Sequence, residues 1–597
     1  MQMNRHNAFI APIRNIFAQI HDYMQNSDKL VTTLLAVFIG VGIAYAAIGF
    51  RLLVLEVQDI FLHSDQENIL LHATTLAWWQ ILLATVSGGL IISVLIRWAL
   101  PDGRLLSIAE VIEANALRDT RISLRQGLAS ALAAATALGA GSAGGREGPV
   151  VHLGATLSAQ ISRYLHLSPH MARTILGCGV AAAVSASFNA PIAGVFFALE
   201  VILGHYALHA FAPIVISSVA ATIVTRIHLG DFPAFILPDY QSPSPFEFPA
   251  FVMLGVVCAL TAIIFIKSLL YTENFTNKLP VPRWALPPIG GLGVGLIAII
   301  FPAILGVGYG ATDAALKEML SFELMLMLIV AKTAATAISL AFRFGVGVFS
   351  PSLFLGAMVG GAFGFLATAA FPDYSSGQGL YAIVGMAAVA SATLGAPIST
   401  LLMIFELTGD YQITLALMAA VVVANLITNH YLKTKSLFFI QLAGRGIYLE
   451  GGRVRHLLRT TFMRELMKDD YVTVGQTASQ ERIRELFREH RHGQIFVLDE
   501  MGRLSGMITF ADVRKTILDE NPEEEKTVTA ADMLRPLNHV LVPSDNLETA
   551  FKTMERAGED VLPVVTSDAQ SEVVGIIHHK DVLMAYNRAL TDEQSNA

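Results

Sequence analysis

Two copies of one short motif hold the residues of this chain that are best suited to chemistry. Residues 145–155 and 347–357 both read G-x-x-x-P-x-x-x-L-G-A. Each copy is followed by an Ala-Pro-Ile segment. A glutamate lies nine residues after the proline of that segment, Glu200 after the first copy and Glu406 after the second. The two sets lie at nearly one offset, about 200 residues, so they predict two related halves. The repeat alone leaves parallel and inverted halves open.

The glycines and prolines of these copies predict helices that begin within an apolar region. Glycine lets a backbone approach an ion closely, and proline fits the first turn of a helix. A helix N-terminus has unpaired N–H groups and about half a positive charge, so it can bind an anion without a cationic side chain. The motif residues are Gly145, Pro149, Gly347, Ser350 and Pro351. The competing interpretation is that these glycines only allow helices to pack closely.

Glu147 is an ionisable side chain within the first copy. Such side chains are costly inside a membrane and are therefore functional candidates. A carboxylate at a helix N-terminus would occupy the place of the anion itself. Deprotonated, it would compete with a permeant anion, and protonated or turned aside it would open the path. The alternative is a structural ion pair with the neighbouring Arg146.

The composition indicates what kind of body positions these motifs. Of the 597 residues, 54% are apolar and 15% are charged, and the mean hydropathy is +0.56. Residues 441–597 hold 45 charged residues and residues 1–440 only 43, which is typical of a membrane body followed by a soluble tail. No large basic patch favours a nucleic-acid partner. Cys178 and Cys258 lie in apolar runs and support neither a disulfide nor a metal site.

Two uncharged stretches, 30–50 and 77–96, are each long enough to cross a membrane. The polar segment 1–29 makes a poor signal peptide, so we expect a retained first span and a cytoplasmic N-terminus. Beyond residue 126, Gly, Ala, Pro and Ser interrupt short apolar segments. Broken helices survive at membrane depth where protein buries them or where they line a cavity, as in channels and transporters.

These motifs resemble those of the CLC chloride channels and chloride/proton antiporters. Residues 145–149 match the GREGP signature of that family, 347–351 its GIFAP-type segment, and 305–310 and 188–191 are also similar. The resemblance covers roughly residues 30–445. It implies an all-α polytopic membrane domain of broken helices in two inverted repeats. It further implies a homodimer in the lipid bilayer, with an anion pore in each subunit and chloride as the bound ion.

The same resemblance assigns roles to individual residues. Glu147 would be the external gating glutamate. The backbone N–H groups of Val348 and Phe349 would bind the central anion, and those from Arg146 to Gly148 would bind the outer one.

Three departures from the family pattern concern the anion site. Glu110 matches a family glutamate, which puts Leu106 at the filter-serine position with Ser107 beside it. Either Ser107 replaces that serine after a one-residue shift or the hydroxyl is lost. Phe438 stands where the family has a pore tyrosine, and the run 341–346 is bulkier than the usual glycines. Because a hydrogen bond to a charged group contributes about 1.5–3 kcal/mol, we expect a weaker central site or an altered selectivity.

Val201 occupies the position at which antiporters of the family place an internal proton-relay glutamate. Valine cannot be protonated, which favours a passive anion channel. A proton-coupled antiporter remains the alternative, since similar antiporters lack that glutamate. A CBS-regulated cation transporter and an intramembrane enzyme are weaker alternatives, because acidic residues and catalytic pairs are scarce in the body. Glu200 and Glu406 are interpreted as groups that satisfy helix ends.

The soluble tail resembles an α/β tandem CBS module in the cytoplasm. Two similar units end in related segments, 506–513 and 575–582. The resemblance implies that Thr509 and Asp512 could bind an adenine nucleotide, whereas in the second unit His578 replaces the threonine and Asp581 is kept. The alternative is a dimerising scaffold without a ligand. No metal site and no required cofactor are expected.

The sequence therefore predicts an anion channel with a regulatory tail in a multi-pass membrane protein, expected in a bacterial inner or plasma membrane. The expected divisions are 1–29 for the N-terminal segment, 30–445 for the membrane domain with halves of about 30–230 and 250–445, 446–458 for a linker, 459–519 and 527–590 for the CBS units, and 591–597 for the end of the chain.

Overall fold

A computed structural model describes most of the chain. The described residues are 28–64, 69, 72, 74–100, 103–206, 208–231, 243–408, 411–449, 452–490, 493–518, 528–567 and 572–594. The expected N-terminal segment 1–29 lies outside them except for its last two residues, as does the end of the expected segment 591–597. The chain divides into two compact units, Met1–Gly446 and Ile447–Ala597.

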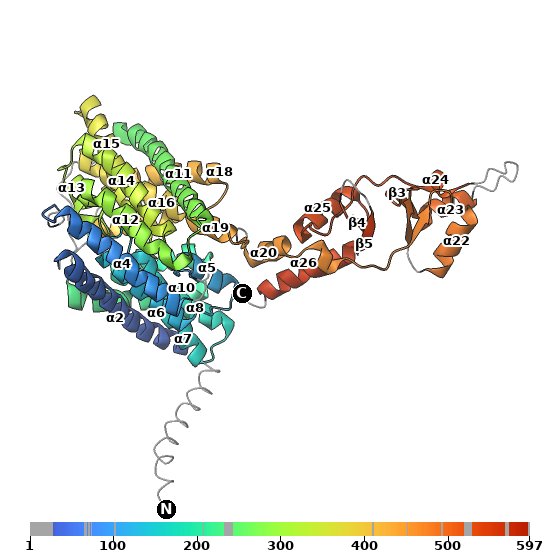
Figure 1. Cartoon of the computed structure of the whole chain (residues 1–597), viewed down its shortest axis with the longest axis horizontal. Coiled ribbons are helices and arrows are strands. Elements are labelled where there is room, and N and C mark those ends of the chain that lie inside the picture. The colour runs from blue at the N-terminus through green and yellow to red at the C-terminus, as the bar shows by residue number, and fades with distance from the viewer. Residues whose placement is uncertain are drawn as a thin grey trace, which may run out of the picture. The chain divides into compact units, whose positions relative to one another are not determined.

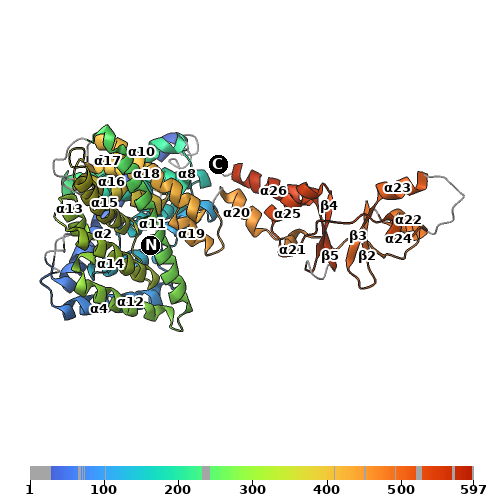
Figure 2. The same cartoon turned by 90° about the horizontal axis from the view of Figure 1, so that it is seen from above.

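The first unit is built from helices (Figures 1 and 2). Its first half contains α2 (Asp28–Leu62), α4 (Trp78–Ala99), α5 (Ile108–Leu117), α6 (Leu124–Gly139), α7 (Glu147–Tyr164), α8 (Pro169–Phe188), α9 (Pro191–Phe197), the π-helix η1 (Ala198–Leu203) and α10 (Leu208–Leu229). Its second half contains η2 (Pro245–Glu247), α11 (Phe248–Lys278), η3 (Arg283–Ala285), α12 (Leu286–Ile300), η4 (Pro302–Ile304), α13 (Tyr309–Leu316), α14 (Phe322–Ala341), α15 (Phe349–Ala370), α16 (Gln378–Leu394), α17 (Pro397–Thr408), α18 (Gln412–Leu432) and α19 (Leu437–Ala443).

Nine helical segments among the described residues are long and apolar enough to cross a membrane. The predicted spans 30–50 and 77–96 fall on α2 and α4, which confirms both as apolar helices. Large apolar side chains remain exposed on the outside of the unit, for example Phe38 on α2 and Trp98 on α4. An apolar outer surface around a packed interior is what a lipid environment allows.

Close helix packing depends on small residues. Helices α15 and α16 form the most extensive helix pair of the unit. A Cβ atom on Gly356 of α15 would overlap the carbonyl oxygen of Gly385 on α16, and a Cβ on Gly385 would overlap that of Gly356. The two backbones therefore touch, as small residues permit in membrane helix pairs. Such packing keeps the N-terminus of α15 in a fixed place inside the unit.

The second unit contains small sheets flanked by helices (Figure 2). Strands β1 (Thr473–Gly475), β2 (Gln494–Leu498) and β3 (Leu504–Thr509) form one sheet, in which β1 and β2 are parallel and β2 and β3 antiparallel. Strands β4 (Val561–Val565) and β5 (Val573–His578) form an antiparallel pair. The helices are α20 (Gly452–Thr460), α21 (Met463–Leu466), α22 (Gln480–Glu489), α23 (Phe510–Leu518), α24 (Ala530–Met533), α25 (Leu547–Ala557) and α26 (His579–Gln594). Helix α20 thus occupies much of the expected linker 446–458.

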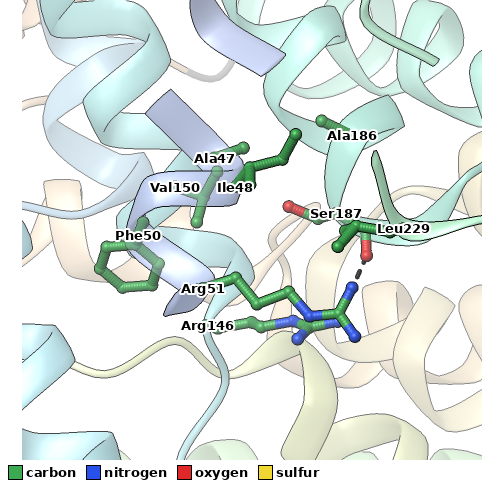
Figure 3. A pocket seen from close by; sticks show the side chains of 9 residues that line it. All are labelled: Ala47, Ile48, Phe50, Arg51, Arg146, Val150, Ala186, Ser187 and Leu229. Atoms are coloured by element: carbon green, nitrogen blue, oxygen red, sulfur yellow. Dashed lines mark hydrogen bonds between the residues drawn. The ribbon is translucent and has the colours of Figure 1, made fainter. Parts of the chain in front are cut away.

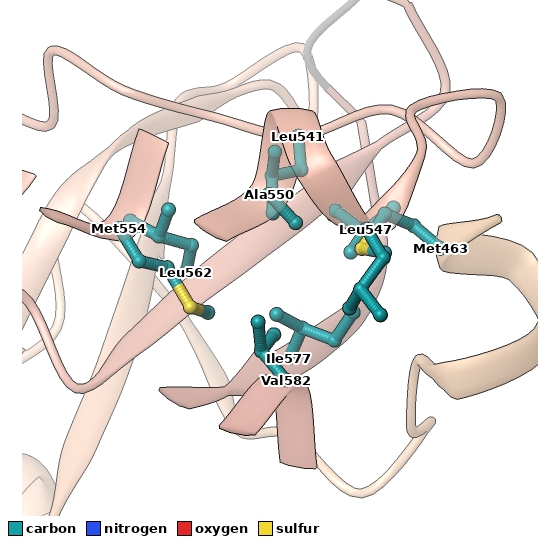
Figure 4. Packing of buried hydrophobic residues seen from close by; sticks show 9 residues of the cluster. Met463, Leu541, Leu547, Ala550, Met554, Leu562, Ile577 and Val582 are labelled. Carbon is teal, nitrogen blue, oxygen red and sulfur yellow. The ribbon is translucent and has the colours of Figure 1, made fainter. Parts of the chain in front are cut away.

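Each half of the tail contributes a short helix to the core of the other half. Met463 of α21 is fully buried against Leu547, Ile577 and other residues of the second half (Figure 4). Conversely, Ala530 and Met533 of α24 pack into the core of the first half. The two cores are therefore interdependent.

Candidate functional site

The two motif copies meet at their glycines. The backbone N–H of Gly145 donates to the carbonyl of Gly347, and the N–H of Gly347 donates to the carbonyl of Gly145, each over 2.7 Å. This is an isolated antiparallel bridge between segments from the two halves. Helix α7 begins at Glu147 and α15 at Phe349, just after the bridge, which confirms the predicted helix starts. A reciprocal, antiparallel contact between equivalent segments is what two halves related by a two-fold axis produce.

The carboxylate of Glu147 lies at this meeting point. Its Oε2 atom and the backbone N of Ser350 lie 2.7 and 3.1 Å from the point where a Cβ on Gly145 would stand. The side chain is only 2% exposed, and Oε2 has no hydrogen-bond partner among the residues that the structure describes. Oε1 accepts a hydrogen bond of 3.0 Å from the hydroxyl of Tyr309. The Glu147 carboxylate thus stands where the first turns of α7 and α15 converge, in the field that favours an anion.

Arg146 makes only a long contact with the carboxylate of Glu147. Its Nε lies 3.9 Å from Oε1 of Glu147, at the outer limit of an ion pair. The guanidinium also donates to the carbonyl of Ser187 over 3.3 Å and lies over the Tyr309 ring. Arg146 therefore joins several segments around the site and is not simply the partner of Glu147.

The start of α15 is buried and packed against the first half. Val348 and Phe349 are 5% and 3% exposed. The Phe349 ring contacts those of Phe188 and Phe197, with ring centres 5.0 and 6.5 Å away. Phe188 opens the motif 188–191, so these three rings connect the end of α8, α9 and the second motif copy, residues 347–357. Gly148, Pro149, Ser350 and Pro351 are buried in the same first turns.

The Ser107 hydroxyl is used inside its own helix cap. Ser107 precedes α5, and its N–H and hydroxyl donate to Oε2 of Glu110 over 2.7 and 2.9 Å. The other oxygen of Glu110 accepts from Arg445 over 2.6 Å. The N–H of Leu106 donates to the Ser130 hydroxyl over 3.1 Å. In this arrangement the Ser107 proton is committed to Glu110.

Phe438 is buried near the start of α19, and α19 packs against α5. Helix α5 in turn contacts α7, which carries Glu147. The bulky run 341–346 contacts the segment before α5, because Arg343 donates to the carbonyl of Gly103 and Gly345 lies against Leu105. The segments expected around the anion site are therefore linked by contacts among α5, α7, α15 and α19.

The repeated glutamates cap helices in the opposite halves. Glu406 accepts hydrogen bonds of 2.8 Å from the N–H groups of Ile192 and Ala193 at the start of α9. Glu200 accepts from the N–H groups of Ile398 and Ser399 at the start of α17. The interpretation that both carboxylates satisfy helix ends is confirmed. Their exchange between halves was not predicted. Val201, next to Glu200, is buried in η1.

Lys332 is a site-neighbouring residue that the sequence reasoning missed. It lies on α14, is fully buried, and donates to the carbonyls of Ile304 and Gly306 over 2.9 and 3.0 Å. The Gly306 carbonyl also accepts from the N–H of Gly144, which precedes Gly145 of the first motif copy. A lysine in the apolar run of α14 was the available signal, because ionisable residues in such runs are rare without a purpose.

The candidate nucleotide residues of the tail are engaged with other protein groups. The N–H and hydroxyl of Thr509 donate to Oδ2 of Asp512 over 3.0 and 2.6 Å at the start of α23. In the second half, Asp581 pairs with Lys468 over 2.7 Å. The equivalent acidic residues of the two halves thus have different partners.

Comparisons with known proteins agree with this architecture. The family model described as voltage gated chloride channel matches residues 88–429, and that of the CBS domain matches residues 463–519 and 530–588. The putative chloride channel protein ClcB-like of Ralstonia nicotianae is 31% identical over 414 residues, which are 68% of this chain and 96% of that protein. The chloride channel protein CLC-e of Arabidopsis thaliana is 33% identical over 378 residues, 59% of this chain. This chain spans 52% of the length of that plant protein.

Solved structures share the fold. A slow cyanobacterial Cl⁻/H⁺ antiporter aligns with a TM-score of 0.62 and 20% identity over 69% of this chain and 97% of that one. A eukaryotic CLC transporter aligns with a TM-score of 0.60 and 19% identity over 92% of this chain and 98% of that one. Family members are channels and transporters, not enzymes. The chain therefore belongs to the voltage-gated chloride channel (CLC) family of multi-pass membrane anion channels and transporters, and its tail carries two CBS domains.

Proposed function

We propose that this chain is a passive chloride channel in which Glu147 is the gate. One observation carries the proposal. The Glu147 carboxylate is buried where the N-termini of α7 and α15 converge, and within the described part of the chain its Oε2 has no hydrogen-bond partner. A negative side chain in that position occupies the place that suits a small anion. When it is protonated or turned aside, the converging N–H groups become available to a permeant anion.

The anion would be held chiefly by backbone groups. We assign the N–H groups of Val348 and Phe349 to a central site and those between Arg146 and Gly148 to an outer site. The commitment of the Ser107 hydroxyl to Glu110 and the presence of Phe438 leave fewer side-chain donors on the inner side. Weak binding suits conduction, because an ion must also leave the site.

Passive conduction is supported by Val201. Its buried aliphatic side chain cannot carry a proton between Glu147 and the cytoplasm. Glu200 and Glu406 each cap a helix of the opposite half, so neither is assigned to proton transfer.

The proposal extends to assembly and location. Each subunit of a homodimer would hold its own pore, with the N-terminus and the tail in the cytoplasm of a bacterial inner or plasma membrane. We assign a regulatory role to the CBS pair. An adenine nucleotide would reach Thr509 and Asp512 only after their mutual hydrogen bonds rearrange.

The test is anion flux by the purified full-length protein in liposomes, with and without a pH gradient. The reversal potential is expected to follow the chloride gradient alone. Glu147→Gln should raise the flux or remove its pH dependence, whereas Glu323→Gln, at an exposed position on α14, should change neither. A reversal potential that shifts in a fixed ratio with the proton gradient would establish the antiporter instead. An unchanged flux and pH response in Glu147→Gln would refute the gate.

A further inference from the structure

We propose that Arg51 and Arg146 form an entry site for a small monovalent anion, one step outside the Glu147 gate. The role of this site in conduction rests on the proposed function, but binding of the anion does not.

Both arginines line the same two cavities. The first cavity lies between α2, α7 and α8, where Arg51 and Arg146 are joined by Ser187 and apolar residues. Figure 3 shows the two guanidinium groups at the same end of this pocket, beside Ser187. The second cavity is lined by both arginines, by Gln58, and by residues of α2, α6 and the segment before α13. Arg51 of α2 and Arg146, just before α7, thus line both cavities.

The second cavity borders the gate directly. Its lining includes Tyr309 and Arg146. The Tyr309 hydroxyl donates to Glu147 over 3.0 Å, and the Arg146 Nε lies 3.9 Å from the same carboxylate. An anion in this cavity would therefore be separated from the gating carboxylate by a single layer of side chains.

The charge of the cavities favours an anion. Among their described lining residues there is no aspartate or glutamate, whereas both linings contain two guanidinium groups. The remaining walls include the apolar side chains of Val54, Leu138 and Val150. Low-dielectric walls concentrate the field of the two cations and raise the local concentration of anions. Guanidinium groups also offer paired donors to a small oxyanion.

The size of the second cavity limits the ligand. Its volume is about 30 Å³, whereas a single water needs about 10–15 Å³. A halide or nitrate fits this space, and a nucleotide or a lipid headgroup does not.

The position of Arg51 sets the side of the membrane. Arg51 lies 23 residues after the start of α2 at Asp28, or roughly 35 Å along a helix. With the N-terminus in the cytoplasm, Arg51 lies near the outer boundary of a hydrocarbon core about 30 Å thick. The site would therefore receive anions from outside.

The experiment measures conduction by oriented full-length protein in planar bilayers while bromide or nitrate is varied on the outer side. Arg51→Gln is expected to raise the half-saturating outer concentration about 3–10-fold and to leave the maximal flux nearly unchanged, and Arg51→Lys should have a smaller effect. Arg97→Gln is the matched control, since Arg97 is a membrane-domain arginine on α4 that lines neither cavity. A half-saturating concentration in Arg51→Gln equal to that of Arg97→Gln overturns the proposal.

Anion binding without flux gives an independent arm. Bromide diffused into crystals of the full-length protein should give an anomalous peak between Arg51 and Arg146. Bromide peaks at the filter but not between the arginines would overturn the entry site even if Arg51→Gln failed to fold. If Glu147→Gln leaves gating unchanged while Arg51→Gln weakens outer binding, the gate fails and the entry site stands. The reverse pair of results rejects only the entry site.

Discussion

Glu200 in the first half of the chain accepts hydrogen bonds from both the backbone N–H and the hydroxyl of Ser399 in the second half. Glu406 in the second half likewise caps α9 in the first half. Each repeat therefore completes a helix end that belongs to the other. The first N–H groups of a helix have no partner within the helix, and these carboxylates supply one.

This exchange predicts that Glu200→Ala and Glu406→Ala each destabilise the membrane domain. Loss of a helix cap costs about 0.5–2 kcal/mol. The purified full-length variants should unfold at lower temperature in detergent, and Gln should be milder than Ala because its amide oxygen still accepts. Glu323→Ala, at an exposed position in α14, is the control. An equal melting temperature for Glu200→Ala and Glu323→Ala would contradict the role of the cap.

The bridge between Gly145 and Gly347 predicts that Gly347→Ala lowers both stability and anion flux. A Cβ on Gly347 would lie 3.0 Å from the carbonyl oxygen of Gly145 and 3.0 Å from the N of Gly148. Both are backbone atoms, so the two filter segments must move apart. Overpacking of this kind costs about 1–3 kcal/mol, and we expect reduced stability and at least several-fold lower anion flux. Gly49→Ala, where a Cβ meets nothing within 4 Å, should retain wild-type flux. Wild-type flux in Gly347→Ala would show that the bridge tolerates separation.

The hydroxyl of Tyr309 is expected to hold the gate closed. Tyr309→Phe removes the donor to Glu147 Oε1 and keeps the aromatic ring. A hydrogen bond to a charged group contributes about 1.5–3 kcal/mol, so the carboxylate should leave its position more often and basal chloride efflux from liposomes should rise several-fold. In Tyr431→Phe, which removes an exposed contact with Lys267, efflux should not change. A lower efflux in Tyr309→Phe would mean that the hydroxyl supports conduction instead.

The exchange of short helices in the tail predicts that Met463→Ala damages the second CBS core. Met463 is fully buried there, and shortening a buried Met to Ala costs about 2–5 kcal/mol. Hydrogen exchange of the full-length protein should show loss of protection in β4 and β5, although Met463 belongs in sequence to the first CBS unit. Met501→Ala, at an 80% exposed position of the same tail, should change nothing. Loss of protection confined to residues 463–519 would contradict the exchange.

Glu548 makes the stability of the tail depend on pH. Hydrogen bonds from Lys552 and Arg459 lower the pKa of the Glu548 carboxyl to about 2, against about 4.3 in an unfolded chain. Because the folded pKa is the lower one, the stabilisation is present above about pH 4.3 and is lost as the pH falls toward 2. Hydrogen exchange in α25 should accelerate over that range. Glu548→Gln should flatten this dependence, and Glu555→Gln, an exposed neighbour, should keep it. An unchanged pH profile in Glu548→Gln would exclude this origin.

Much of the membrane domain follows from local sequence. The starts of α7 and α15 coincide with the repeated glycine and proline motifs, because proline and glycine constrain a helix start within a few residues. Apolar runs likewise predict α2 and α4, because a span needs only length and hydrophobicity. The role of Glu200 and Glu406 as helix caps was also predicted, but not their partners.

The sequence by itself determined that this protein has an apolar body with two related halves, two filter motifs with a buried carboxylate, and a charged tail. Tertiary structure alone decided that the backbones of Gly145 and Gly347 hydrogen-bond to each other and that the Ser107 hydroxyl donates to Glu110. It also decided that Met463 packs into the core of the second CBS unit. It also placed Arg51 of α2 beside Arg146 in one cavity. The reason is physical. Propensity and hydrophobic pattern act over a few residues along the chain, whereas these contacts join segments that only close packing brings together.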